Sequence, residues 1–332
     1  MSILKQITSK LNNRAVALSI KIIILILLVF VLYKQLVVSK RLSDVSKELA
    51  EGWSQGGELL LIFCVLLMFA NWGAEALKWK LLIDKLTPIR GIRSFKAVWT
   101  GITLGLFTPN RIGEFGGRLL YIPMKHRISG VVSSLIGSFS QILITFGIGI
   151  IALVFYSNSV LAVNGPALNA YIFIGILLLL ILVIVYYNLG LTITLMKNRK
   201  LFKRIIPYVS VLDRYHFMDY NRVLGLSLFR FAIFTAQYLI LLEVFGVHLN
   251  IGEGVMVIGV IFLAQTVLPS FTVAELFTRG NISLYFLGNY SDNSGGILAA
   301  STGLWLLNLI IPAVLGYFFI LRKNFFKKRK YE

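Results

Sequence analysis

The stretch YIFIGILLLLILVIVYY, Tyr171–Tyr187, carries no charged side chain and decides the fold class. With its flanks it reaches the roughly 20 apolar residues that a helix needs to cross a bilayer. Further uninterrupted apolar runs occur along the chain, among them Ile22–Leu32. These runs are too many and too long to be core helices of one soluble domain. The sequence therefore predicts an all-α integral membrane protein.

The charge balance indicates the same environment. Of the 332 residues, 57% are hydrophobic and 14% are charged, whereas soluble domains carry roughly a quarter charged residues. The formal net charge is +19, and the basic residues lie almost entirely between the apolar runs. This distribution is typical of loops that lie on anionic headgroups, and it disfavours a nucleic-acid-binding face. The partners expected are membrane lipids with anionic headgroups, and no nucleic acid.

The sequence offers little for metal or covalent chemistry. Cys64 is the only cysteine, so no internal disulfide or cysteine metal cluster can form. The 3 histidines are scattered and lack the spacing of a metal site. No nucleophile–base set, phosphate-binding glycine loop or paired-carboxylate motif is recognisable. We therefore expect no cofactor and no metal, and we identify no catalytic residue.

Six apolar runs are long enough to be predicted as full spans. They are Ala15–Val37, Glu58–Leu77, Gly130–Tyr156, Tyr171–Tyr187, Leu224–Val244 and Gly296–Leu321.

Two further apolar segments are too short to span. Phe95–Phe107 ends close to Pro109, and Val255–Leu268 ends at Pro269. A helix of about 14 residues rises only ~21 Å, less than the ~30 Å thickness of the hydrocarbon core. Each segment is followed by a second short apolar piece, and we predict that each pair forms a re-entrant hairpin. The second pieces are Leu119–Met124 and Ile282–Leu287.

The positions of lysine and arginine predict the orientation through the positive-inside rule. Basic clusters follow the second and fourth predicted spans and end the chain, whereas residues 157–168 and 288–295 contain no lysine or arginine. Both termini are therefore expected in the cytoplasm of a multi-pass protein in the inner or plasma membrane. Residues 38–56 carry both signs of charge and are predicted to form an external interfacial helix.

The two hairpin tips resemble each other. Each has a proline, a glutamate five or six residues later and an arginine four residues after that. These residues are Pro109, Glu114 and Arg118 in the first hairpin, and Pro269, Glu275 and Arg279 in the second. Three spans separate the hairpins, so they are expected to enter the membrane from opposite faces, as in the inverted repeats of secondary transporters. We predict one membrane domain over residues 1–332, with a first repeat at 1–156, a second at 168–321 and a basic tail at 322–332.

Each glutamate–arginine pair has i, i+4 spacing, so its two side chains can meet on one helix face. Ionisable groups at membrane depth are unfavourable unless they are paired or hydrated. Two interpretations stay open. The pairs could be structural, or the arginines could leave Glu114 and Glu275 to hold a phosphate, whose geometry a guanidinium matches bidentately.

Other polar residues on the predicted spans are expected to face the bundle interior. On the third span they are Ser134, Ser138, Gln141 and Thr145; on the second, fifth and sixth they are Asn71, Glu75, Lys78, Arg222, Arg230, Gln237 and Asn308. Hydrogen bonding between helices is the favoured role of the stripe on the third span, and Gln141 is also a candidate for substrate binding. Arg230 lies deep enough that a hydrated cavity is an equal alternative to simple burial. Lys78 and Arg222 are expected only to anchor the cytoplasmic interface.

Two motifs resemble those of a known family. The segment Asn71–Leu82 ends in KWKLL, which is similar to the basic-Trp-x-x-Leu stretch of the lysylphosphatidylglycerol synthase transmembrane family. The segment Thr108–Glu114, read together with Arg118, is similar to that family's Pro-x-Arg-x-Gly-Glu-x-x-x-Arg signature. The second motif adds Arg111 to the candidate substrate-binding residues.

The resemblance covers most of the chain and implies a helical membrane protein with re-entrant segments that binds or moves lipids. The lipids of this family are often phospholipids or polyprenyl-linked glycolipids. The soluble aminoacyltransferase domain of the full-length multiple peptide resistance factors does not follow here, so lysyl transfer is not expected. The second hairpin also departs from the pattern, because Phe271–Ala274 contains no glycine before Glu275.

Several functions compete at this stage. The first is a lipid flippase or lipid-binding transporter for an anionic phospholipid or a polyprenyl-linked glycolipid. The second is a membrane-embedded transferase, although isolated carboxylates give it little support. The third is an accessory subunit of a separate lipid or glycan synthase of the cell envelope. A small-ion transporter ranks lower, and the sequence makes no prediction of the oligomeric state.

Overall fold

The computed structural model describes residues 14–33, 57–108, 111–157, 166–190, 206–268 and 275–322. Throughout these ranges the chain is helical and no strand occurs, which confirms the all-α prediction. In chain order the elements are α2 (Arg14–Leu32), α4 (Glu58–Asp84), α5 (Gly91–Gly105), α6 (Gly113–Leu119), the 3-10 turn η3 (Met124–His126), α7 (Arg127–Tyr156), α8 (Pro166–Tyr187), α10 (Ile206–Val209), the 3-10 turn η6 (Ser210–Arg214), α11 (Phe217–Val244), α12 (Ile251–Val267), α13 (Glu275–Leu287), α14 (Ser294–Trp305), the π-helix η7 (Leu306–Ile310) and α15 (Ile311–Leu321).

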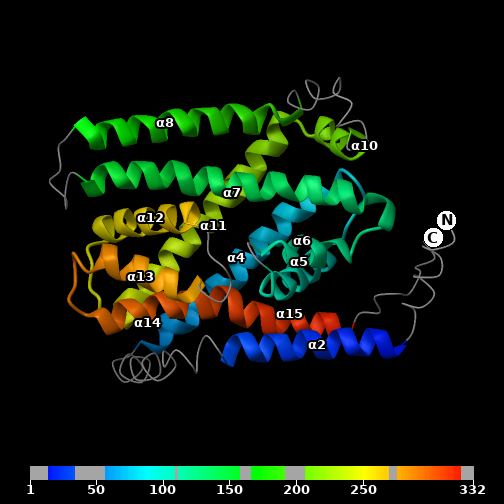
Figure 1. The fold of residues 1–332 in the computed structure, drawn as a ribbon, viewed down its shortest axis with the longest axis horizontal. Coiled ribbons are helices and arrows are strands. Elements are labelled where there is room, and N and C mark those ends of the chain that lie inside the picture. The colour runs from blue at the N-terminus through cyan, green and yellow to red at the C-terminus, as the bar shows by residue number, and fades with distance from the viewer. Residues whose placement is uncertain are drawn as a thin grey trace.

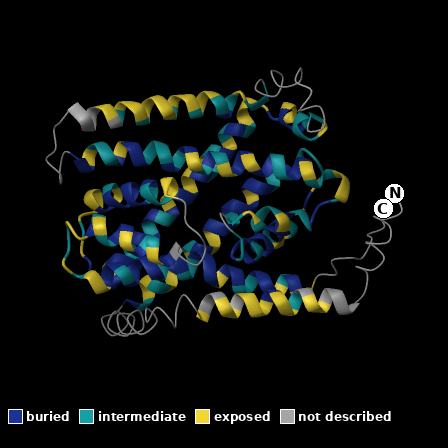
Figure 2. Cartoon of the chain, viewed as in Figure 1, coloured by how far each residue is buried: buried dark blue, intermediate teal, exposed yellow. Residues whose placement is uncertain are grey.

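Each of the six predicted spans overlaps a helix, and residues 34–37 of the first span lie outside the described residues. Within the described ranges, four helical stretches are long and apolar enough to cross a membrane, namely Glu58–Asp84, Met124–Tyr156, Phe217–Val244 and Ser294–Leu321. The other two predicted spans form α2, with 19 residues, and α8, with 22. Both lie at the sides of the bundle and expose apolar side chains along their length (Figures 1 and 2). Such continuous apolar surface is typical of contact with lipid, so the chain is a multi-pass membrane protein. The predicted interfacial helix at residues 38–56 lies outside the described residues.

The two predicted hairpins form pairs of short helices, α5–α6 and α12–α13. The predicted second arm of the first hairpin, Leu119–Met124, is wrong, because α6 ends at Leu119 and a turn follows. The arm is instead the glycine-rich segment that carries Glu114 and Arg118. A Cβ on Gly117 would lie 2.6 Å from Gly101 Cα and 2.7 Å from the Thr100 carbonyl oxygen. Close backbone packing on α5, rather than apolar content, therefore determines where this arm lies.

The order of elements occurs twice: a long helix, two short helices and another long helix. The first set is α4, α5, α6 and α7, and the second is α11, α12, α13 and α14 with its continuation α15. The sets interlock, since α4 packs on α11, α5 on α15 and α12 on α7. Figure 1 shows α5–α6 and α12–α13 toward opposite ends of the long helices. Their opposite entry into a membrane, and the division at residues 1–156 and 168–321, stay predictions.

Two buried clusters hold the hairpins against the long helices. Around the first hairpin, Trp79 and Trp99 belong to a cluster shared by α4, α5 and α15. Around the second, Tyr238 and Phe245 belong to a cluster shared by α7, α11, α12 and α14. Figure 2 shows that buried residues are concentrated in the middle of the molecule. The region between the hairpins is thereby held in place from both sides.

Candidate functional site

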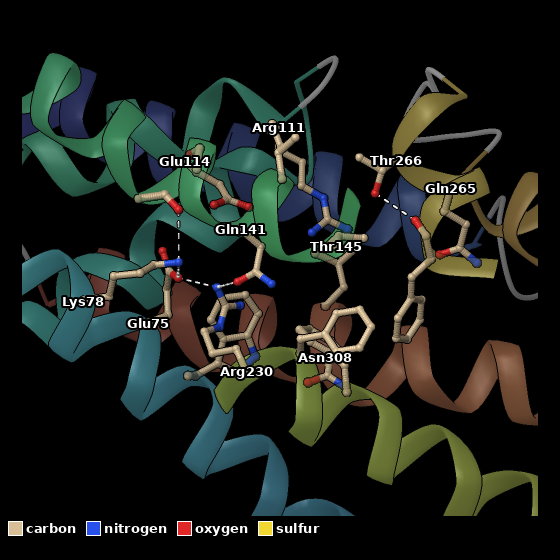
Figure 3. A pocket seen from close by; sticks show the side chains of 18 of the residues that line it. Glu75, Lys78, Arg111, Glu114, Gln141, Thr145, Arg230, Gln265, Thr266 and Asn308 are labelled. Carbon is tan, nitrogen blue, oxygen red and sulfur yellow. Dashed lines mark hydrogen bonds and ion pairs between the residues drawn. The ribbon is translucent and has the colours of Figure 1, made fainter. Parts of the chain in front are cut away.

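A cavity of about 370 Å³ lies between the two hairpins. Its lining comes from α4, α6, α7, α11, α12, α13 and the α14–η7 junction (Figure 3). Its volume is within the usual range for ligand sites, roughly 300–1,000 Å³. Among the described lining residues are five cationic side chains and two carboxylates. They are Lys78, Arg111, Arg118, Arg230 and Arg279, with Glu75 and Glu114.

Glu75 is the centre of the charged end of this cavity. Its Oε1 pairs with Arg118 Nη1 at 2.9 Å, and its Oε2 pairs with Lys78 Nζ at 2.9 Å. Arg230 Nη1 also donates to Oε2. All four side chains are buried, and they come from α4, α6 and α11. Glu75 thus contacts three cations. Even with Glu114, which also pairs with Arg118, two carboxylates face three cations here, which leaves positive charge in excess.

Arg118 joins the first hairpin to this centre. Its Nη2 pairs with Glu114 Oε2 at 3.0 Å, as the i, i+4 spacing predicts. Its Nη1 reaches Glu75 on α4, a contact that spacing alone does not predict. Arg118 therefore bridges two carboxylates from different helices. The role of the Glu114–Arg118 pair in substrate binding stays a prediction.

Arg111 lies at the tip of the first hairpin with φ of 56°, and among the described residues it is the only one other than glycine with positive φ. This left-handed conformation is unfavourable for a side chain with a Cβ, by about 1–2 kcal/mol. Figure 3 shows its side chain directed into the cavity. Strained residues of this kind cluster at ligand-binding sites, and contact of Arg111 with substrate stays a prediction.

The second hairpin contributes Arg279 to the cavity lining. Its Nη1 donates a hydrogen bond to Gln265 Oε1 at 3.2 Å, which connects α13 to α12. Glu275 is the first residue of α13, and its side chain lies outside the described part of the structure. The predicted Glu275–Arg279 pair is therefore untested, while Arg279 does reach the cavity shared with the first hairpin.

The position of Lys78 differs from the one predicted from the sequence. Lys78 was expected to anchor the cytoplasmic interface, but its side chain is 1% exposed. Besides Glu75, its Nζ donates to the Gly137 carbonyl and to Ser227 Oγ, each at 3.2 Å. The physical reason is the length of α4, which continues to Asp84 rather than ending at Leu77. The helical spacing of Glu75 and Lys78 was the signal that could have identified this ion centre.

A chain of amides orients Arg230 next to its contact with Glu75. Arg230 Nε donates to Asn71 Oδ1 at 2.8 Å, and Asn71 Nδ2 donates to Asn308 Oδ1 at 3.0 Å. Asn308 Nδ2 continues the chain to Gln237 Oε1 at 3.0 Å. Asn308 lies on the π-helix η7, a local widening that often occurs at functional sites. The interior position expected for these amides is confirmed.

The polar stripe on α7 divides into two kinds of residue. Ser134 Oγ accepts a hydrogen bond from Trp79 Nε1 at 3.1 Å. Gln141 accepts from Arg230 and donates to the Ser227 carbonyl, both at 3.4 Å. Thr145 is only 8% exposed and lines the cavity, yet its hydroxyl has no hydrogen-bond partner among the described residues. Interhelical hydrogen bonding therefore explains Ser134 and Gln141 but not Thr145.

Metal ligands do not gather in this cavity. Across the described residues no group of three or more His, Cys, Asp or Glu side chains could hold a metal ion. The cavity instead combines guanidinium, ammonium, amide and hydroxyl groups, which are donors suited to an anion.

The family model for the lysylphosphatidylglycerol synthase TM region matches residues 16–274. The chain belongs to this family. The match includes α4, the first hairpin, α7 and α11, and therefore most residues of the ion centre. Comparison with curated proteins and with solved structures returns no match. Membership of the lysylphosphatidylglycerol synthase TM family agrees with a role connected to membrane lipids.

Proposed function

We propose that the protein binds the headgroup of an anionic lipid in this cavity and carries it across the membrane. Its cargo would be an anionic phospholipid or a polyprenyl-linked glycolipid. The observation that carries the proposal is the excess of buried cations around Glu75 in a cavity large enough for a headgroup. Buried cations beyond their counter-ions are unfavourable in hydrocarbon, so an incoming anion would stabilise them.

The rim of the cavity supports an amphiphilic cargo. Exposed apolar side chains stand at both hairpin ends, with Ile112 62% exposed beside Arg111 and Val267 61% exposed beside Thr266. Ile142 of α7 lines the cavity and is 43% exposed. A lipid could place its phosphate among the arginines and leave its acyl chains against this rim. A soluble anion would gain nothing from such a rim.

Glu75 would act as a tethered counter-anion while the site is empty. Carboxylate and phosphate both accept paired hydrogen bonds from a guanidinium, so a phosphate can replace Glu75 at Arg118 and Arg230 without leaving these cations unpaired. The same exchange at Glu114 would release the other side of Arg118. Arg279 and Glu275 would act similarly on the second hairpin, as their sequence spacing suggests.

Translocation would use the repeated arrangement of the helices. Discontinuous helices that meet near the midplane are typical of transporters that expose one site alternately to either side. In this proposal both termini are cytoplasmic, the protein lies in the inner or plasma membrane, and a separate lipid or glycan synthase is a candidate partner.

A lipid-scrambling assay with purified protein in vesicles tests the proposal. Arg118→Gln should lower transbilayer movement of an anionic phospholipid at least tenfold, because it removes the residue that joins both carboxylates. Arg222→Ala is the matched control, since Arg222 is an exposed arginine on α11 and should leave the rate unchanged. Equal rates for wild type and Arg118→Gln, with both proteins folded, would rule out this mechanism.

A further inference from the structure

We infer that the second end of the cavity binds an uncharged, hydroxyl-bearing group attached to the phosphate, such as glycerol or a sugar, and disfavours an ammonium group. The inference rests on the proposed function, because it presumes that the phosphate lies at the Glu75 end. It adds the part of the headgroup that determines which anionic lipid is selected.

The two ends of the cavity differ in chemistry. The Glu75 end is a network of ion pairs, whereas the other end is lined by Thr145, Gln265 and Thr266 with the ring of Phe262. In the view of Figure 3, Thr145 lies between Gln141 and the pair Gln265–Thr266. A headgroup that extends from the Glu75 end would therefore meet neutral hydrogen-bonding groups, an aromatic ring and the guanidinium of Arg279.

The hydroxyl of Thr145 is the observation that indicates a ligand at this end. A helical threonine commonly donates to the carbonyl four residues earlier, and Thr266 does so to Phe262 at 2.8 Å. Thr145 is 8% exposed and makes no such bond to any residue in the described ranges. The side chain is mostly covered, but its hydroxyl oxygen opens onto the cavity, where a ligand can reach it. A ligand hydroxyl, which both donates and accepts, would satisfy it.

Gln265 determines the preference between a hydroxyl and an ammonium group. Its Oε1 accepts from Arg279, so its amide nitrogen is the part left to bind a ligand, and no described residue pairs with that nitrogen. An amide N–H and a guanidinium N–H are both donors, and they match a hydroxyl or ether oxygen. An ammonium group has only donors and carries a positive charge. The Thr145 hydroxyl can accept from it, but the guanidinium of Arg279, which bonds to Gln265, repels it. The subsite therefore disfavours ethanolamine and aminoacyl headgroups.

Binding of short-chain lipids to the purified full-length protein tests the inference. The probes are dioctanoyl phosphatidylglycerol, phosphatidylmethanol and phosphatidylethanolamine, with a short-chain prenyl glucosyl phosphate for the sugar. Phosphatidylmethanol has the phosphate charge of phosphatidylglycerol but no hydroxyl. Intrinsic fluorescence provides the dissociation constant, because Trp72 and Trp305 line the cavity.

At least one hydroxyl-bearing probe should bind about fivefold more tightly than phosphatidylmethanol, the effect of one net hydrogen bond. Whichever of phosphatidylglycerol and the prenyl glucosyl phosphate binds more tightly identifies the class of lipid that the subsite selects. Phosphatidylethanolamine should bind more weakly than phosphatidylmethanol. Thr145→Val should remove the fivefold preference and leave the phosphatidylmethanol affinity unchanged. Gln265→Glu supplies an acceptor and should shift the preference toward phosphatidylethanolamine.

Two results would overturn the subsite. One is equal affinity of wild type for phosphatidylmethanol and both hydroxyl-bearing probes. The other is a Thr145→Val variant that weakens every probe by the same factor. Failure of the proposed function looks different, because phosphatidylmethanol itself would then not bind, or Arg118→Gln would leave its affinity unchanged.

Discussion

The two hairpins occupy equivalent places in the order of helices but present different chemistry to the cavity between them. The first ends in α6, whose glycines let it pack backbone to backbone on α5 and whose Arg118 joins two carboxylates. The second ends in α13, whose Arg279 bonds to the neutral amide of Gln265. A repeated arrangement can therefore supply two unlike ends of one binding site, one for charge and one for hydrogen bonding.

The largest expected effect is at the charged end. Glu75→Gln leaves Lys78 and Arg230 without a carboxylate partner in the described region, and breaking a buried ion pair destabilises a protein by about 3–5 kcal/mol. Gln265→Leu, at the neutral end, should lower stability by about 1 kcal/mol, the contribution of one hydrogen bond. Thermal unfolding in detergent would compare the two variants. Equal losses would contradict the placement of the ion-pair network at the Glu75 end of the cavity.

The next effect concerns the close packing of α6. Gly117→Ala would place its Cβ 2.7 Å from the Thr100 carbonyl oxygen, and overpacking of this kind costs about 1–3 kcal/mol. Gly116→Ala, one residue earlier, meets nothing within 4 Å and should be neutral or slightly stabilising. Urea or thermal unfolding would measure the stability of both variants. A destabilised Gly116→Ala together with a neutral Gly117→Ala would contradict the close packing of Gly117 on α5.

A smaller effect tests the strained tip of the first hairpin. Arg111→Gly and Arg111→Ala both remove the guanidinium and should weaken binding of an anionic lipid to the same degree. Only glycine adopts φ of 56° without strain, so Arg111→Gly should be more stable than Arg111→Ala by about 1 kcal/mol. Lipid-binding and thermal unfolding curves of the two variants would measure both effects. An Arg111→Ala variant as stable as Arg111→Gly would show that the backbone at this position is not strained.

The smallest effect compares two hydroxyls on α7. Ser134→Ala leaves the buried Trp79 N–H without its partner and should destabilise by about 1 kcal/mol. Thr145→Val removes a hydroxyl that bonds to no described residue, and stability should change by less than about 0.5 kcal/mol. If Thr145→Val were the more damaging variant, its hydroxyl would have a structural partner rather than a ligand.

The interior polar residues show how far sequence reasoning reaches. The i, i+4 spacing of Glu114 and Arg118 predicted their pairing, because both residues lie on one helix whose geometry is known in advance. The same reasoning misplaced Lys78, because the end of α4 depends on tertiary contacts that continue the helix to Asp84. It also missed that Arg118 and Arg230 share Glu75, since that contact joins α6 and α11 to α4.

Local sequence by itself determined that this chain is a bundle of apolar helices with two interruptions, because runs of apolar residues and the prolines near each break act within one segment. Tertiary structure alone decided that one carboxylate would contact three cations and that Thr145 would face the cavity without a partner among the described residues. Those features depend on distances between helices far apart in the chain, and such distances are determined by packing.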